Sequence, residues 1–138
     1  MGNSLTQDSS LDPNEAIHFS NVDEFKVWAN DLDKQFDGEI EVPNIKLTSG
    51  DCGDGMYTGS IGAGFGTLYF NVTVAGGKVT GVGSTYGGWH LGTTWSQGSF
   101  VQKGNKVIVT GSFNYNLLLV DDSCFYTQYV TFVITLPC

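Results

Sequence analysis

The stretch from Thr58 to Trp95 constrains the fold more than any other part of the chain. It reads TGSIGAGFGTLYFNVTVAGGKVTGVGSTYGGWHLGTTW and holds one charged residue, Lys78. Within it, Thr67–Ala75 alternates strictly between apolar and polar residues, which is typical of a strand with one buried face. Gly76 and Gly77 separate this run from the next one, and that spacing predicts a two-residue hairpin turn.

Glycines recur inside these strands. A regular hairpin at residues 76–77 would set Val72 opposite Gly81 and Phe70 opposite Gly83. Glycine in a strand interior is destabilising by roughly 0.5–1 kcal/mol relative to alanine, so its repeated use needs a structural reason. Sharp bending at the corners of a small barrel is the reason we favour. A ligand lying against bare backbone is the alternative.

Residues 20–36 form the one helix that the sequence predicts. Apolar side chains recur there at three- and four-residue spacing, acids occupy the first turn, and Gly38 follows as a stop signal. The apolar stripe has to cover something, either an open end or flank of the barrel or, alternatively, the groove of a partner. Its members are Val22, Phe25, Trp28, Leu32 and Phe36.

The fold class follows from the number and spacing of the strands. Residues 39–138 predict about seven or eight strands with short connections, including a second hairpin turn at residues 103–106. Residues 1–13 are polar and predict a disordered arm, and residues 14–138 predict a single domain. We therefore expect a mainly β protein: one closed antiparallel β-barrel, up-and-down or Greek key, with one N-terminal amphipathic helix.

The charge of the chain restricts its partners. Fourteen acids stand against six lysines and no arginine, giving a formal net charge of −8. Nucleic acid is therefore not an expected partner, because its recognition depends on basic patches. No apolar run approaches the roughly 20 residues of a transmembrane helix.

The N-terminus bears on localisation. No signal peptide is visible, so the protein is either cytoplasmic or secreted after loss of its signal. The opening MGNSLT fits the pattern for myristoylation at Gly2, which would anchor the chain to a membrane. An ordinary linker at the start of the chain is the alternative.

Three cysteines, Cys52, Cys124 and Cys138, allow one internal disulfide at most. We predict a Cys52–Cys124 bond because both residues lie beside predicted loops; three reduced thiols are the alternative. Residues 49–55, SGDCGDG, are predicted to be a loop, and they lack the pattern of a calcium site. The sequence therefore predicts no metal and no cofactor.

No catalytic motif is present, and the aromatic residues give the better functional prediction. Tyr86, Trp89, His90 and Trp95 lie among glycines and threonines. Aromatic side chains exposed on a rigid β scaffold bind protein, lipid or carbohydrate surfaces, although the same rings could fill the barrel interior. We predict a non-enzymatic protein that binds a partner through this aromatic and glycine-rich face. A lipocalin-like carrier, or an enzyme with its site inside the barrel, is the alternative.

The glycine-rich segments GSIGAGFGTLYFNVTV and GKVTGVGSTYGGWHLG, with the aromatic strands that follow, resemble the virulence-associated (Vap) proteins of actinobacterial pathogens. The resemblance covers roughly residues 50–138. It implies a small secreted eight-stranded Greek-key barrel without a catalytic site, and a role in host interaction. It carries no functional residue over to this chain.

Overall fold

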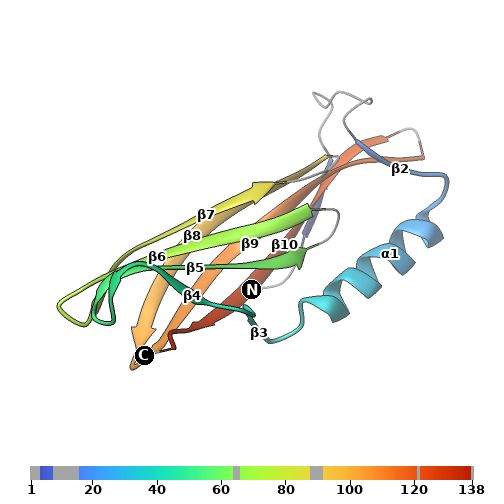
Figure 1. Ribbon diagram of the computed structural model, residues 1–138. Coiled ribbons are helices and arrows are strands. Elements are labelled where there is room, and N and C mark those ends of the chain that lie inside the picture. Colours follow the sequence, from blue (N-terminus) through green and yellow to red (C-terminus); the bar gives the residue numbers. More distant parts are fainter. Residues whose placement is uncertain (1–3, 8–15, 64–65, 88–91, 121, 138) are drawn as a thin grey trace.

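The computed structural model describes residues 4–7, 16–63, 66–87, 92–120 and 122–137. The chain is mainly β, as predicted, and has one helix beside two sheets (Figure 1). The two sheets, named sheet A and sheet B below, share one hydrophobic core with the helix.

Sheet A is built on a long antiparallel hairpin, β9 (Lys106–Leu119) with β10 (Asp122–Thr135). Strands β8 (Thr93–Lys103) and β2 (Ile17–Phe19) pair with β9, and strands β1 (Ser4–Gln7) and β3 (Glu39–Glu41) pair with β10. The turn between β8 and β9 lies at residues 104–105, where the sequence predicted it.

Sheet B is an antiparallel meander of four consecutive strands. They are β4 (Lys46–Asp51), β5 (Asp54–Ala63), β6 (Gly66–Ala75) and β7 (Lys78–Gly87). The predicted hairpin turn at Gly76 and Gly77 is confirmed, and both residues have positive φ angles, 59° and 75°. Such angles are accessible to glycine without the steric penalty that other residues pay.

The pairing of β6 with β7 differs from the regular register that we expected. A register shift between Thr73 and Val74 sets Val72 opposite Val82 and Phe70 opposite Ser84. The cause is a β-bulge, which places one extra residue on one strand of the pair. Gly81 and Gly83 therefore do not lie opposite the large apolar residues of β6.

Helix α1 (Val22–Gln35) confirms the predicted helix. Asn21 caps it, and its side-chain oxygen accepts a hydrogen bond from the Glu24 N–H at 2.9 Å. The helix buries Phe25, Ala29 and Leu32, and its apolar stripe covers the end of sheet A that carries two tyrosines. The stripe is thus used within the fold.

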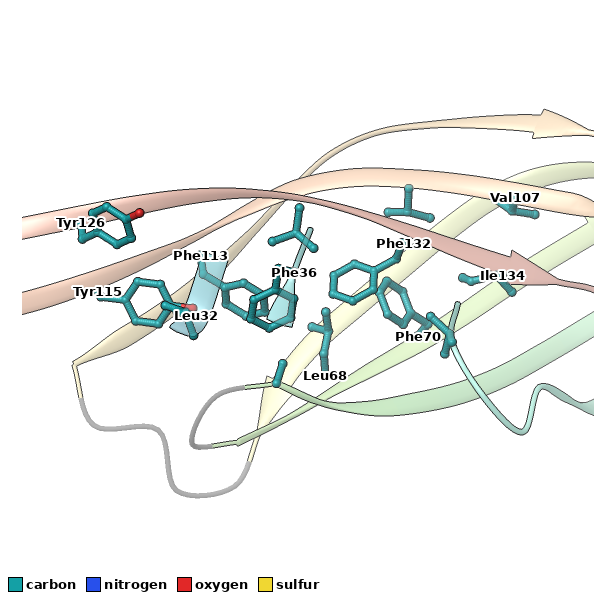
Figure 2. Close-up of a cluster of buried hydrophobic side chains, with 14 of the residues drawn as sticks. Leu32, Phe36, Leu68, Phe70, Val107, Phe113, Tyr115, Tyr126, Phe132 and Ile134 are labelled. Atoms are coloured by element: carbon teal, nitrogen blue, oxygen red, sulfur yellow. The ribbon is translucent and has the colours of Figure 1, made fainter. Parts of the chain in front are cut away.

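The core runs as one band along the inner face of sheet A (Figure 2). At the helix end, the Trp28 ring packs against Tyr115 and Tyr126, with centroids 5.1 and 5.9 Å apart. At the sheet B end, Phe70 packs against Phe132 at 5.4 Å. Sheet A therefore has two covers, the helix over one half and sheet B over the other.

The predicted closed barrel is wrong. Neither sheet closes on itself in the described part of the chain, because β7 and β8 are not joined by a backbone ladder. Three side chains of β8 bridge them instead: Trp95 donates to Ser84 Oγ (2.8 Å), Gln97 donates to the Val82 carbonyl (2.9 Å), and Gln102 accepts from the Val79 N–H (2.8 Å). The helix occupies the inner face that a closed barrel would cover with strands.

Three further predictions need correction. Sheet A is mixed, since β2 and β3 run parallel to their partner strands. Residues 49–55 form most of a hairpin, and Ser4–Gln7 of the predicted disordered arm form strand β1. Gly2 and its predicted myristoylation lie outside the described residues.

Candidate functional site

A cleft of about 840 Å³ lies beside the C-terminal end of α1. Its walls come from four elements that are distant in sequence. They are Asp33 with residues 36–39, residues 96–98 of β8, residues 110–112 of β9 and residues 128–131 of β10. This volume is within the range of small-molecule sites in proteins, roughly 300–1,000 Å³. We name it the edge cleft, because β10 is here close to the edge of sheet A.

A hydrogen-bonded group of four side chains supports the wall of the edge cleft. The Tyr126 hydroxyl donates to both carboxylate oxygens of Asp33, at 2.9 and 3.0 Å, and Gln128 Nε2 donates to Oδ1 at 3.1 Å. Gln128 Oε1 in turn accepts from the Tyr115 hydroxyl at 3.1 Å. The Asp33 carboxylate is thus held in one orientation by neutral donors.

Regular secondary structure places each member of this group. Tyr126 and Gln128 are two residues apart in β10, so both point to the inner face, and Tyr115 lies opposite Tyr126 on β9. Asp33 follows the buried Leu32 on the helix and is half-buried, so it lies at the flank of the packed stripe. The helix thereby brings an acid to the border between the core and the cleft.

The electrostatics of the edge cleft are one-sided. Its described lining includes Asp33, Asp37 and Glu39 and neither lysine nor arginine. Burial raises the pKa of Tyr115, and the neighbouring Tyr86, Tyr126 and Asp33 raise it further. Tyr115 therefore remains a neutral hydrogen-bond donor throughout the physiological range.

The polar groups lining the edge cleft are suited to holding a ligand. Residues with hydroxyl side chains from three strands are part of its lining, namely Ser96, Thr110, Ser112, Tyr129 and Thr131. Among the residues that the structure describes, no three His, Cys, Asp or Glu side chains are grouped as metal ligands would be. The cleft offers hydrogen-bond acceptors, hydroxyls and negative charge.

The structure packs two of the four predicted binding residues against the core, where both are half-buried. The Trp95 ring packs against Phe113 with centroids 4.8 Å apart, and it lies where a side chain at Gly111 would otherwise be. The Tyr86 ring packs against Phe113 at 5.3 Å, and its hydroxyl accepts from the Gly66 N–H. These rings fill the space between the sheets, which is the alternative that the sequence left open.

The two other residues of that prediction, Trp89 and His90, lie outside the described residues. The aromatic face made of all four side chains therefore stays a prediction. Tyr86 and Trp95 help to join the sheets, and the role of these four residues in binding stays a prediction.

Sequence reasoning missed the group around Asp33. One signal was present: β10 carries Val130, Phe132 and Ile134 on its buried face, and the same alternation extended backwards reaches Gln128. A glutamine in the buried register of an otherwise apolar strand needs hydrogen-bond partners. Its exposed fraction is 1%. The identity of those partners could not be obtained from the pattern.

The predicted Cys52–Cys124 disulfide is wrong. Cys124 is a buried free thiol, whereas Cys52 is disulfide-bonded. Cys124 points to the inner face of β10, where the helix end of the core covers it, and a loop position was the basis of the prediction. Cys138 lies outside the described residues.

Cys124 is expected to react slowly with iodoacetamide in the native protein at pH 8 without reductant. Burial raises the pKa of its thiol, and the charge of Asp122 raises it further, so the reactive thiolate is scarce. Unfolding in guanidinium chloride, still without reductant, should label this cysteine rapidly, as measured by peptide mass spectrometry. Cys124→Ala is the control and should abolish that label. Fast native labelling, or a labelled Cys52, would contradict the assignment.

Comparison with known proteins finds no match to a family model, to a curated protein or to a solved structure. The resemblance to the Vap proteins therefore stays a prediction. In the described part of the chain, no helix has the length and apolar character needed to cross a membrane.

Proposed function

We propose that this protein works by binding, and that the edge cleft takes a small ligand carrying a protonated amine. The observation that carries the proposal is the Asp33 carboxylate, which Tyr126 and Gln128 fix in place at the wall of an 840 Å³ cleft. A carboxylate oriented before binding loses little freedom when a cation arrives. Charge-assisted hydrogen bonds to such a group are among the stronger ones in proteins.

The remainder of the cleft supports a cationic ligand. Asp37 and Glu39 add negative charge on the same side, and the chain as a whole carries a net charge of −8. A cleft lined by one sign of charge raises the local concentration of the opposite sign. Hydroxyl groups in the lining provide acceptors and donors for the remaining polar atoms of the ligand.

A carrier with its ligand between the sheets, which was the alternative, has little to support it. The space there is filled by Leu68, Phe70, Phe113 and Phe132, each with at most 2% of its surface exposed. Interiors packed in this way leave few voids larger than a water molecule. The edge cleft, by contrast, offers a ligand a volume of about 840 Å³.

The test is a calorimetric titration at low salt with matched probes, beginning with cadaverine and 1,5-pentanediol. The amine should bind and the neutral diol should not, and added salt should weaken binding. Asp33→Asn, which removes the charge with little change of shape, should lower the affinity for the amine roughly tenfold or more.

The matched control is Asp31→Asn. Asp31 lies on the same helix, is exposed, and does not line the cleft, so its replacement should leave the affinity nearly unchanged. An equal loss of affinity in the two variants would show that only the overall charge of the protein matters, and would contradict the proposal. Binding of the diol as tightly as the amine would contradict it as well.

A further inference from the structure

A second concave surface lies on the outer face of sheet B, on the opposite side from the core. It is a groove of about 400 Å³ over β5 and β6, bordered by the start of β4 and by β7. Tyr69 lies in it with 51% of its surface exposed. We name this surface the Tyr69 groove.

The glycines of β7 shape the Tyr69 groove. After the bulge, Gly83 lies opposite Asn71 and Gly87 opposite Thr67, on the outward side of the sheet. A Cβ atom at Gly87 would be 3.3 Å from Tyr69 Cε2, and one at Gly83 would be 2.6 Å from Asn71 Oδ1. The tyrosine ring therefore packs directly on the backbone of Gly87, and the asparagine amide packs on that of Gly83.

One of these side chains is also fixed by a hydrogen bond. Asn71 Oδ1 accepts from the Gly83 N–H at 3.1 Å, which orients the amide and directs its NH₂ group away from that contact. The groove is thus formed before any ligand binds. Side chains fixed in advance lose less conformational entropy on binding.

The chemistry of the Tyr69 groove is neutral and rich in hydrogen-bonding groups. The hydroxyls of Thr58, Ser60 and Thr85 have no hydrogen-bond partner within the part of the chain that the structure describes. The described lining contains no acid, and its single charged residue is Lys46. It therefore differs from the edge cleft, where acids gather.

We propose that the Tyr69 groove binds a neutral carbohydrate, with one sugar ring placed on the face of Tyr69. The C–H groups on one face of a hexose form an apolar surface that suits an aromatic ring, and its hydroxyls suit amides and other hydroxyls. A lipid chain would need a more continuous apolar surface. A phosphorylated ligand would need more than one cation.

The test is saturation-transfer NMR on the full chain with D-glucose, D-galactose, D-mannose and N-acetyl-D-glucosamine, each as free sugar and as trisaccharide. At least one should receive saturation from the protein. Tyr69→Ala should weaken its binding by about fivefold or more, whereas Tyr69→Phe should retain it, because the ring is kept. Met56→Ala is the matched control: it removes another exposed side chain from the same face, outside the groove.

A second variant keeps the test valid if Tyr69→Ala fails to fold. Ser60→Arg fills the groove from an exposed position without touching the core, and it should also abolish binding. Absence of saturation transfer to every sugar would overturn the proposal, as would unchanged binding in both Tyr69→Ala and Ser60→Arg. A dimer in solution that these variants dissociate would show that a second copy of the chain occupies the face, and would overturn it too. Asp33→Asn should leave sugar binding intact, which separates this proposal from that on the edge cleft.

Discussion

Replacing Phe113 by alanine is expected to lower the free energy of unfolding by about 3–5 kcal/mol. Phe113 has no exposed surface, and its ring meets those of Phe36, Tyr86 and Trp95 at centroid distances of 5.5, 5.3 and 4.8 Å. It thus lies where the helix, sheet A and sheet B meet, beside the side chains that bridge β7 and β8. Its removal leaves a cavity that none of these elements can fill alone.

Chemical denaturation followed by tryptophan fluorescence measures this loss. A domain of this size is stable by roughly 5–15 kcal/mol, so the change should be a large fraction of the total. Phe125→Ala is the matched control, because Phe125 lies on the outer face of sheet A and is only half-buried. We expect a loss of roughly 1 kcal/mol there. Equal losses in the two variants would show that the ring at 113 is not central to packing.

Alkaline pH is expected to destabilise the protein through Tyr115. Burial raises the pKa of this hydroxyl above its ordinary value of 10.0, so the folded protein holds the proton at a pH where the unfolded chain has lost it. Stability from this source is fully present below pH 10 and declines above it. The expected slope is about 1.4 kcal/mol per pH unit for one proton.

Denaturation midpoints measured between pH 8 and pH 11.5 test this expectation, with Tyr115→Phe as the comparison. The phenylalanine variant loses the hydrogen bond to Gln128 and should be less stable at pH 8 by roughly 1–3 kcal/mol, because a buried acceptor is left unsatisfied. Above pH 10, however, its stability should fall less steeply than that of the parent protein. Parallel slopes would show that Tyr115 does not hold its proton in the folded state.

The edge cleft and the Tyr69 groove show how much of a candidate binding site the residue pattern can predict. The sequence singled out the glycine-rich stretch for Tyr86 and Trp95, which the structure packs half-buried against the core. Alternation gives the face of a residue only relative to its neighbours on the strand. It cannot say which face of an open sheet is covered, and here the exposed ring is Tyr69.

What the sequence by itself determined are the features that depend on near neighbours. Period-two alternation defined the long strands, apolar spacing with acids in the first turn defined α1, and Gly76 with Gly77 defined a hairpin turn. Each of these is governed by backbone geometry or by contacts within a few residues. All of them are present in the structure.

Only the tertiary structure decided that the sheets stay open, how β6 and β7 are aligned, and which residues form the edge cleft. The strands β7 and β8 have no backbone ladder between them, and the register of β6 with β7 shifts at Thr73. Neither feature follows from the residue pattern of one strand. Asp33 and Tyr126 are 93 residues apart in the chain, and no local pattern connects them. Such contacts form only when distant segments compete for one apolar face, and that competition is settled by packing of the whole chain.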